Sequence, residues 1–171
     1  MHNILFNGSR EAKHIFILAH GAGSSMDSLF MNLLAKYIAS NDLLVVRFEF
    51  YYMQMRRKGI RLFPDKFEKL LNAYIEVINY VQSEFKSKNI WLGGKSLGGR
   101  VACQVSTLIN IRGVIVYGYP FHTLKNPKNI RIESLQKNSS PILIFQGSKD
   151  KMGNKDEILS YKLSKNVKIV F

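Results

Sequence analysis

Short apolar runs alternate along this chain with longer segments in which apolar residues recur at helical spacing. The runs are three to eight residues long, which suits a strand buried on both faces. Strands are expected at residues 15–18, 43–50, 90–92, 114–117, 142–145 and 167–171. Strand and helix alternation of this kind predicts an α/β fold, a three-layer α/β/α sandwich with a mostly parallel sheet. Functional loops are then expected at the carboxyl ends of the strands.

Three segments between these runs are expected to be helices. Ser24 and Asp27 have the S-x-x-D spacing of a helix start, and Pro64 with Asp65 opens a second helix. A third is expected to begin after residue 96. The apolar faces are formed by Met26, Leu29, Phe30, Leu33, Tyr37 and Ile38 in the first helix, by Phe67, Leu70, Leu71, Tyr74, Ile78, Val81 and Phe85 in the second, and by Val101, Ala102, Val105, Leu108 and Ile109 in the third. The basic, aromatic stretch of residues 51–63 is expected to be a loop.

The composition suits one globular domain over residues 1–171. With 171 residues, 46% of them hydrophobic, the chain can build a substantial core. Its single cysteine, Cys103, excludes an internal disulfide, fits a reducing compartment and is expected in the core. No apolar run approaches the length of a membrane span, and the N-terminal residues lack the hydrophobic core of a signal peptide. We therefore expect a cytoplasmic protein.

The net charge of +13 raises the question of nucleic acid or an anionic membrane as a partner. The basic residues are mostly dispersed, and no helix-turn-helix, zinc or RNA-binding signature accompanies them. We therefore expect no specific nucleic-acid partner and no membrane partner. No cofactor or metal is expected, and the sequence leaves the oligomeric state open.

The stretch Gly94 to Gly98, GKSLG, has the G-x-S-x-G spacing of a turn that presents a nucleophilic serine between a strand and a helix. The same residues also resemble the Gly-Lys-Ser end of a phosphate-binding loop. That loop needs a glycine five residues before Gly94, where this chain has Asn89, and the positions between them have the pattern of a buried strand. Spacing therefore favours the nucleophile, Ser96, over nucleotide binding. An ordinary glycine-rich turn with a capping serine is the simpler alternative.

The stretch His20 to Gly23, HGAG, follows the first predicted core strand and resembles the loop that supplies an oxyanion hole. Acyl transfer needs fixed N–H groups around the oxygen that becomes negative, and the candidates are the backbone amides of Ala22 and Leu97. His20 itself is expected to be structural, because in such a loop the neighbouring backbone binds the oxyanion.

The acid of a catalytic triad should follow the nucleophile in the chain, and Asp150 lies just past a predicted strand. A turn residue is the alternative for an aspartate in a loop. The base is harder to find, because the histidine is usually expected after the last strand and the chain ends at Phe171. His122, in GYPFH, lies at the correct edge of the sheet, either as the base or as a residue that lines the substrate site.

Basic residues near these motifs could bind an anionic substrate. Arg56 and Arg57 follow the predicted strand at 43–50, beside several aromatic residues, and Lys95 adjoins the serine. A solvated basic loop is the alternative for the two arginines.

Together these residues resemble a small α/β-hydrolase-like family. The resemblance covers nearly the whole chain from His14 onward and is carried by AHGAGSSMDS, RFEFYYMQMRRKG, GGKSLGGRVA, GYPFH, NIRIESL and QGSKDKMG. The family is dienelactone-hydrolase-like, and it includes bacterial hydrolases and the hydrolase-like domain of a eukaryotic histone acetyltransferase complex subunit. The resemblance implies a minimal α/β-hydrolase fold, Ser96 as nucleophile and Asp150 as acid. It also implies a histidine after the final strand, which this sequence does not contain.

The sequence therefore predicts a serine hydrolase that acts on a small ester, thioester or related acyl substrate. A catalytically inactive hydrolase fold that serves as a binding module is the alternative, since the expected histidine is missing. We expect weak or no turnover from the chain that ends at Phe171, and restored activity from a chain extended through a histidine loop.

Overall fold

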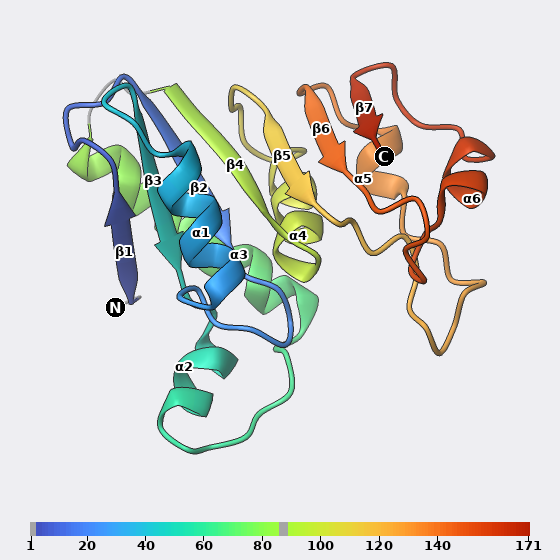
Figure 1. The fold of residues 1–171 in the computed structure, drawn as a ribbon, viewed down its shortest axis with the longest axis horizontal. Coiled ribbons are helices and arrows are strands. Elements are labelled where there is room, and N and C mark those ends of the chain that lie inside the picture. Colours follow the sequence, from blue (N-terminus) through green and yellow to red (C-terminus); the bar gives the residue numbers. More distant parts are fainter. Residues whose placement is uncertain (1–2, 86–88) are drawn as a thin grey trace.

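The computed structural model describes residues 3–85 and 89–171 and contains a seven-stranded sheet (Figure 1). The strands are β1 (Ile4–Asn7), β2 (His14–Ala19), β3 (Leu43–Phe48), β4 (Asn89–Lys95), β5 (Val114–Tyr117), β6 (Ile142–Phe145) and β7 (Val167–Val170). They lie in the order β1-β3-β2-β4-β5-β6-β7. All six predicted strands are present, and the predicted α/β class with a mostly parallel sheet is confirmed.

Strands β2 to β7 are parallel, so their carboxyl ends meet at one edge of the sheet. In Figure 1 their arrowheads point toward the lower edge, where α2 lies. The sequence did not predict β1, which runs antiparallel to β3 at the sheet edge, with Ile4 opposite Phe48. This strand has only four residues, all of them half-buried, so its apolar pattern is too short to stand out.

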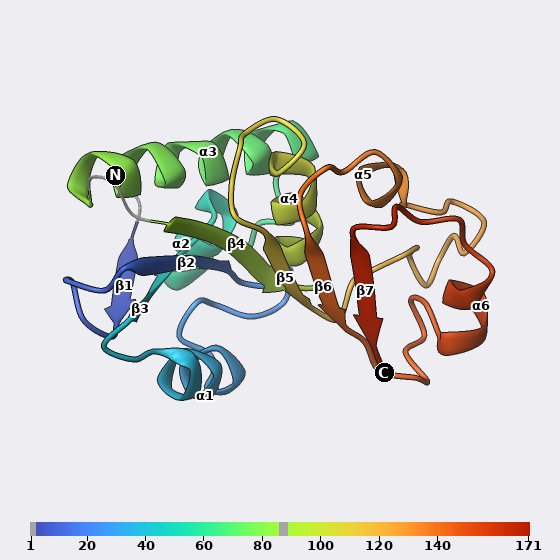
Figure 2. The ribbon, with the colours of Figure 1, turned by 90° about the horizontal axis from the view of Figure 1, so that it is seen from above.

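Six helices flank the sheet in the described residues: α1 (Leu29–Ile38), α2 (Tyr51–Arg57), α3 (Phe67–Glu84), α4 (Leu97–Val105), α5 (Glu133–Gln136) and α6 (Lys155–Leu159). Seen from above, α3 and α4 cover one face of the sheet and α1 lies on the other (Figure 2). The predicted apolar face of α3 is confirmed, since Leu70, Tyr74, Ile78 and Val81 are buried. None of these helices combines the length and apolar character that a membrane crossing requires.

Helix α1 differs from its prediction in start and in orientation. It begins at Leu29 after Ser28, and the Ser25 hydroxyl, rather than a helix N–H, binds the Asp27 carboxylate. Met31 and Ala35 face the sheet and are fully buried. Most of the predicted face is solvent-exposed: Leu29 by 75%, Phe30 by 42%, Leu33 by 42% and Tyr37 by 79%.

A buried arginine on β3 accounts for this orientation. Arg47 donates from Nη1 to the Met26 carbonyl (2.7 Å) and to Asn32 Oδ1 (2.6 Å). Its Nη2 donates to Asn7 Oδ1 on β1 at 2.8 Å. These bonds fix Asn32 toward the sheet edge, so the helix presents Met31 to the core and turns the larger apolar side chains outward.

The stretch predicted as a basic loop begins with a helix, α2. The N–H groups of Met53 and Gln54 bond the Phe50 carbonyl, which starts the first turn. Tyr52 and Met53 are buried, and burial of these two side chains stabilises the helix. The basic, aromatic sequence of this stretch does not by itself indicate a helix. The second half of the stretch, up to Pro64, has no regular structure.

The core lies mainly between the sheet and helices α3 and α4. Cys103 on α4 is fully buried, as predicted, and burial raises the pKa of its thiol. The strand β4 reaches Lys95, so the residues that a phosphate loop would need as open backbone are part of the sheet. This agrees with the choice of a nucleophile turn over a nucleotide site.

Tyr74 places a hydroxyl group inside the sheet. This oxygen accepts a hydrogen bond from Gly93 N–H (3.0 Å) and lies 2.6 Å from the Ile17 carbonyl and 2.9 Å from the Gly93 carbonyl. Tyr74 is fully buried, and burial raises the pKa of the phenol, which stays protonated and able to donate. The side chain therefore links α3 to β2 and β4, the two strands that lead into the HGAG and GKSLG turns.

We expect Tyr74→Phe to lower the free energy of unfolding by about 1–3 kcal/mol, because it leaves a buried N–H and carbonyl without their partner. Urea denaturation measures the loss. Tyr80→Phe on the same helix is the matched control, since Tyr80 is 39% exposed. Equal stability of the two variants would contradict a structural role for the Tyr74 hydroxyl.

Candidate active site

Ser96 lies between the end of β4 and the start of α4, at the carboxyl edge of the sheet. It has φ 50° and ψ −113°, and no other described residue except glycine has a positive φ. Such a conformation costs about 1–3 kcal/mol and persists only where surrounding contacts enforce it. Here Ser96 N–H bonds the Tyr117 carbonyl at 3.1 Å, and the Ser96 carbonyl accepts Arg100 N–H at 3.0 Å. The GKSLG motif therefore forms the sharp turn that the sequence predicts.

Glycines on both sides of the serine allow this turn. A side chain on Gly94 would lie 2.6 Å from Gly99 N, and one on Gly98 would lie 2.6 Å from the carbonyl oxygens of Ala19 and His20. Real Cβ atoms do not approach backbone this closely, so both positions require glycine. The first turn of α4 consequently packs directly against the start of the HGAG loop.

The HGAG loop approaches Ser96 closely enough to share a cavity with it. A Cβ on Gly21 would lie 3.8 Å from the Ser96 Cβ. Ala22, Ser96 and Leu97 line one cavity of about 280 Å³. Leu97 is the first residue of α4, so its N–H has no acceptor within the helix. The predicted nucleophile and both predicted oxyanion donors are thus brought together.

His20 holds this loop from beneath. Its Nδ1 donates to the Gly21 carbonyl (2.7 Å), and its Nε2 accepts from Phe50 N–H (3.1 Å), which fixes the tautomer. His20 is fully buried, and burial lowers the pKa of its imidazole, so the ring stays neutral. Both nitrogens are occupied by backbone, which agrees with the predicted structural role.

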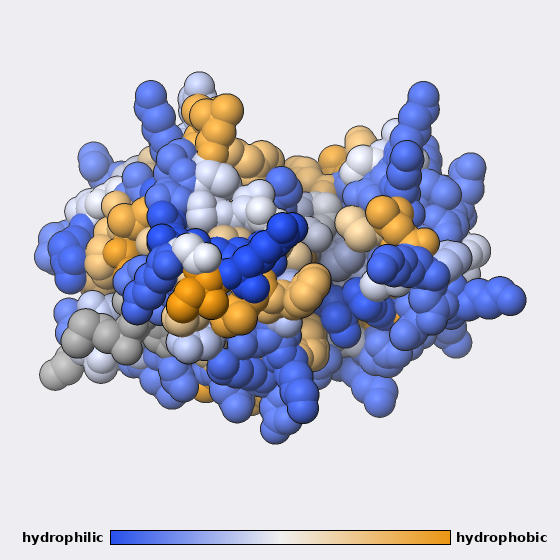
Figure 3. Space-filling view, turned by 90° about the horizontal axis from the view of Figure 1, so that it is seen from below, coloured by the Kyte–Doolittle hydropathy of each residue, from blue (hydrophilic) through white to orange (hydrophobic). Residues whose placement is uncertain are grey.

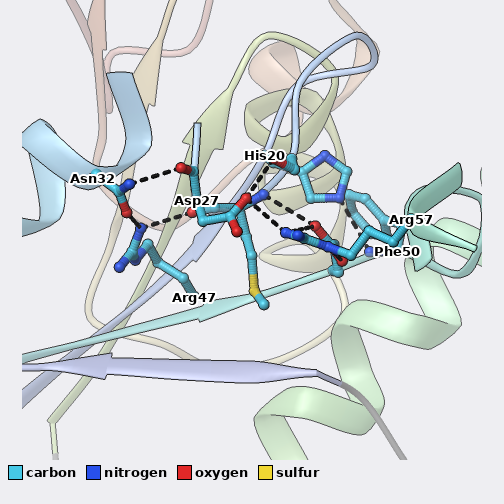
Figure 4. A network of polar contacts seen from close by, with 9 residues as sticks. His20, Asp27, Asn32, Arg47, Phe50 and Arg57 are labelled. Atoms are coloured by element: carbon cyan, nitrogen blue, oxygen red, sulfur yellow. Dashed lines mark hydrogen bonds and ion pairs between the residues drawn. The ribbon is translucent and has the colours of Figure 1, made fainter. Parts of the chain in front are cut away.

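Arg57 is part of a polar network on the far side of this loop (Figure 4). It binds both carboxylate oxygens of buried Glu49, at 2.6 and 2.7 Å, and Asp27 Oδ1 at 2.6 Å. The hydrogen bond from Arg57 lowers the pKa of Asp27 to about 2. Arg57 borders a different hollow, together with Met26 and Asp27. The structure therefore gives Arg57 a role in holding α2 to the loop, contrary to its predicted place at the substrate.

Arg56 and Lys95 also have protein partners. Arg56 donates from Nε to the Leu62 carbonyl (2.7 Å) and from Nη1 to the Ala22 carbonyl (3.4 Å). It touches the HGAG loop without lining the Ser96 cavity. The ammonium of Lys95 lies 4.7 Å from the centre of the Phe30 ring and borders a separate hollow. Arg56 and Lys95 thus lie next to the HGAG loop, but neither lines the Ser96 cavity.

Asp150 lies at the same edge as Ser96. Its Oδ1 accepts the Met152 N–H at 2.8 Å, and Met152 lines the Ser96 cavity. A Cβ on Gly118 would lie 3.9 Å from Asp150 Oδ2. Gly118 directly follows Tyr117, whose carbonyl holds Ser96 N–H. Asp150 follows β6, and one strand, β5, separates β6 from β4, the strand that leads into Ser96.

His122 is buried beside α6. Its Nε2 lies 3.2 Å from Glu157 Oε1, and its Nδ1 lies 3.1 Å from the Thr123 carbonyl. These partners occupy both ring nitrogens, and His122 does not line the Ser96 cavity. Across residues 3–85 and 89–171, no histidine is hydrogen-bonded to the Ser96 hydroxyl.

Two arginines that the sequence did not single out line the Ser96 cavity, Arg100 and Arg131. Arg100 follows Ser96 by four residues on a helix, a spacing that places both on one face and could have indicated it. Arg131 comes from a distant loop, and only the fold brings it here.

Seen from this edge, hydrophobic patches interrupt a largely hydrophilic surface (Figure 3).

Residues 12–171 match the family model described as "Alpha/beta hydrolase domain". The chain belongs to the alpha/beta hydrolase domain family. In this hydrolase domain the strained serine turn and the HGAG loop face the same cavity.

Solved structures share the fold. An alpha-beta serine hydrolase homologue from Coxiella burnetii superimposes with a TM-score of 0.78 at 21% identity, covering 98% of this chain and 79% of that one. A serine hydrolase without a lid from Xanthomonas campestris gives 0.75 at 15% identity, covering 99% and 77%. Est1E from Butyrivibrio proteoclasticus, with ferulic acid bound, gives 0.74 at 16% identity, covering 99% and 84%.

We expect Gly98→Ala to destabilise this hydrolase domain by about 1–3 kcal/mol, because the added methyl group must displace backbone in the HGAG loop. Alanine favours a helix over glycine, so a loss of stability isolates the steric effect. Gly23→Ala is the control, since a Cβ there meets no atom within 4 Å. Thermal unfolding of the two variants compares them, and an unchanged midpoint for Gly98→Ala would contradict the close approach.

Proposed function

We propose that this hydrolase domain acts on a small ester, thioester or related acyl substrate through a Ser96 nucleophile. The observation that carries the proposal is the strained backbone of Ser96. Ser96 lines the same cavity as Ala22 and Leu97. A strained conformation of this kind at a cleft is typical of a functional residue. The family membership and the serine hydrolase neighbours support the same reaction class.

In the proposed reaction, Ser96 Oγ attacks the substrate carbonyl carbon while the hydroxyl proton passes to a base. The carbonyl oxygen becomes negative and accepts hydrogen bonds from the N–H groups of Ala22 and Leu97. One such donor typically contributes about 2.7–4 kcal/mol to transition-state stabilisation. The leaving group then departs with a proton, and water hydrolyses the acyl-serine. In this proposal Asp150 orients the base.

The helix that starts at Leu97 supports this chemistry. Its N-terminal end carries a partial positive charge, which favours the oxyanion. The Ala22 carbonyl lies 3.4 Å from the Tyr52 hydroxyl and 3.4 Å from Arg56 Nη1. The Gly21 carbonyl, which shares a peptide plane with the Ala22 N–H, accepts His20 Nδ1 at 2.7 Å and the Tyr52 hydroxyl at 3.3 Å. These contacts set the orientation of the Ala22 amide before substrate binds.

We expect a fluorophosphonate probe to label the wild-type chain at Ser96 slowly, because no histidine among the described residues is bonded to the Ser96 hydroxyl, and to leave Ser96→Ala unlabelled. Peptide mass mapping locates the adduct. Ser83→Ala is the matched control, since Ser83 lies on α3 away from the cavity, and should label like wild type. Labelling of Ser96→Ala to the wild-type level would refute the assignment. A folded wild-type chain that does not react would favour the alternative of a binding module.

His122 is the base candidate in the chain, and its partners make a specific prediction. Because Glu157 and the Thr123 carbonyl occupy both ring nitrogens, we expect His122→Ala to leave the labelling rate at Ser96 largely unchanged. Glu157→Ala is the companion variant, since it removes the partner of Nε2 and keeps the ring. Loss of labelling in His122→Ala, with the fold retained, would instead identify His122 as the base.

A further inference from the structure

The Ser96 cavity combines an apolar wall with two guanidinium groups. Leu97, Phe67, Leu70 and Met152 are among its apolar residues, and Arg100 and Arg131 are its basic ones. Asp65 also borders the cavity, but its charge is already balanced. Its Oδ1 pairs with the Lys69 ammonium at 3.0 Å, and its Oδ2 accepts Tyr52 N–H at 3.1 Å. The cavity therefore carries an excess of positive charge.

Arg100 is held in place without a polar partner. It lies one helical turn after Ser96, and its guanidinium carbon lies 4.0 Å from the centre of the Phe67 ring. Within the described ranges its side chain has no hydrogen bond and no ion pair. Guanidinium hydrogens usually find acceptors when they are half-buried, so this side chain has donors to spare at the cavity.

Arg131 reaches the same cavity from the segment before α5. Its backbone is fixed at both ends, because its N–H bonds the Phe121 carbonyl (2.7 Å) and its carbonyl accepts the Tyr119 hydroxyl (2.8 Å). Its guanidinium likewise has no hydrogen bond or ion pair in the part of the chain that the structure describes. Two donors are thus directed to one cavity by separate elements.

The two arginines also repel one another. Burial lowers the pKa of Arg100, and the nearby positive charge of Arg131 lowers it further. Glu133 acts in the opposite direction, but forms no ion pair with Arg100 among the described residues. Two like charges kept together in a partly desolvated cavity are stabilised when an anion binds between them.

Resting on the proposed hydrolase function, we propose that Arg100 and Arg131 form an anion subsite, and that the domain selects acyl substrates whose acyl chain ends in a carboxylate. A guanidinium binds a carboxylate through two parallel N–H···O bonds. The apolar residues that line the same cavity suit the methylene groups that separate this carboxylate from the reacting carbonyl.

The size of the cavity restricts the substrate further. Its volume of about 280 Å³ lies just below the roughly 300–1,000 Å³ of pockets that hold drug-sized ligands. A short dicarboxylic half-ester therefore fits better than a long acyl chain. Arg100 and Arg131 are specificity residues in this account, since they contact the far end of the substrate and not the reacting atoms.

A binding measurement tests the anion subsite without requiring catalysis by Ser96. Succinate titrated calorimetrically into Ser96→Ala, which cannot turn over, should bind saturably. Arg100→Gln or Arg131→Gln in that background should weaken binding by about 10-fold to 100-fold, as expected for loss of charged hydrogen bonds. Arg112→Gln is the matched control, because Arg112 is exposed and bonds Asn89 Oδ1 at the other end of β4. It should change nothing. Succinamide, of the same shape without charge, should not bind.

Absence of saturable succinate binding, or equal affinity of Arg131→Gln and Arg112→Gln, would overturn the anion subsite. Thermal unfolding checks that each variant folds, and Arg100→Lys keeps the charge at that position if Arg100→Gln does not fold. For the active chain, each arginine variant should raise the KM for the 4-nitrophenyl half-ester of succinate and leave that for 4-nitrophenyl butyrate unchanged. Saturable succinate binding to a chain with no esterase activity would refute the proposed function alone.

Discussion

The left-handed backbone of Ser96 is the constraint on which the site depends. A serine does not hold φ 50° unaided, and the free energy must come from neighbouring contacts. The Tyr117 carbonyl holds its N–H, and Gly94 and Gly98 let the strand, the helix and the HGAG loop meet without side chains between them. The same contacts that permit the strain also place the Ala22 and Leu97 amides beside the serine.

Buried polar groups stabilise the elements around this turn. Tyr74 joins β2 to β4 from α3, and His20 joins the HGAG loop to the start of α2. Arg57 then attaches α2 to buried Glu49. Each of these groups bonds to backbone atoms or to an opposite charge. These bonds offset most of the free energy that burying the polar groups costs. The HGAG loop is consequently held firmly on the side that carries His20.

Local patterns predict the parts of the fold that depend on neighbouring residues. The strands and the Ser96 turn follow from short apolar runs and from glycine spacing. The orientation of α1 could not be predicted, because Arg47 on another element decides which face meets the sheet. The roles of the basic residues depend on tertiary partners in the same way. Arg57 is paired with Glu49, whereas Arg131 is brought to the serine from a loop that no sequence motif connects with it.

In our proposal Ser96 and the two backbone amides form one acyl-transfer site. A crystal structure of the chain after reaction with a dialkyl 4-nitrophenyl phosphate tests it most directly, because the phosphoryl oxygen mimics the oxyanion. We expect a phosphorus bound to Ser96 Oγ, φ of Ser96 still positive, and the phosphoryl oxygen about 2.7–3.1 Å from the nitrogens of Ala22 and Leu97. An adduct on another residue, or a phosphoryl oxygen that points away from both amides, would contradict it.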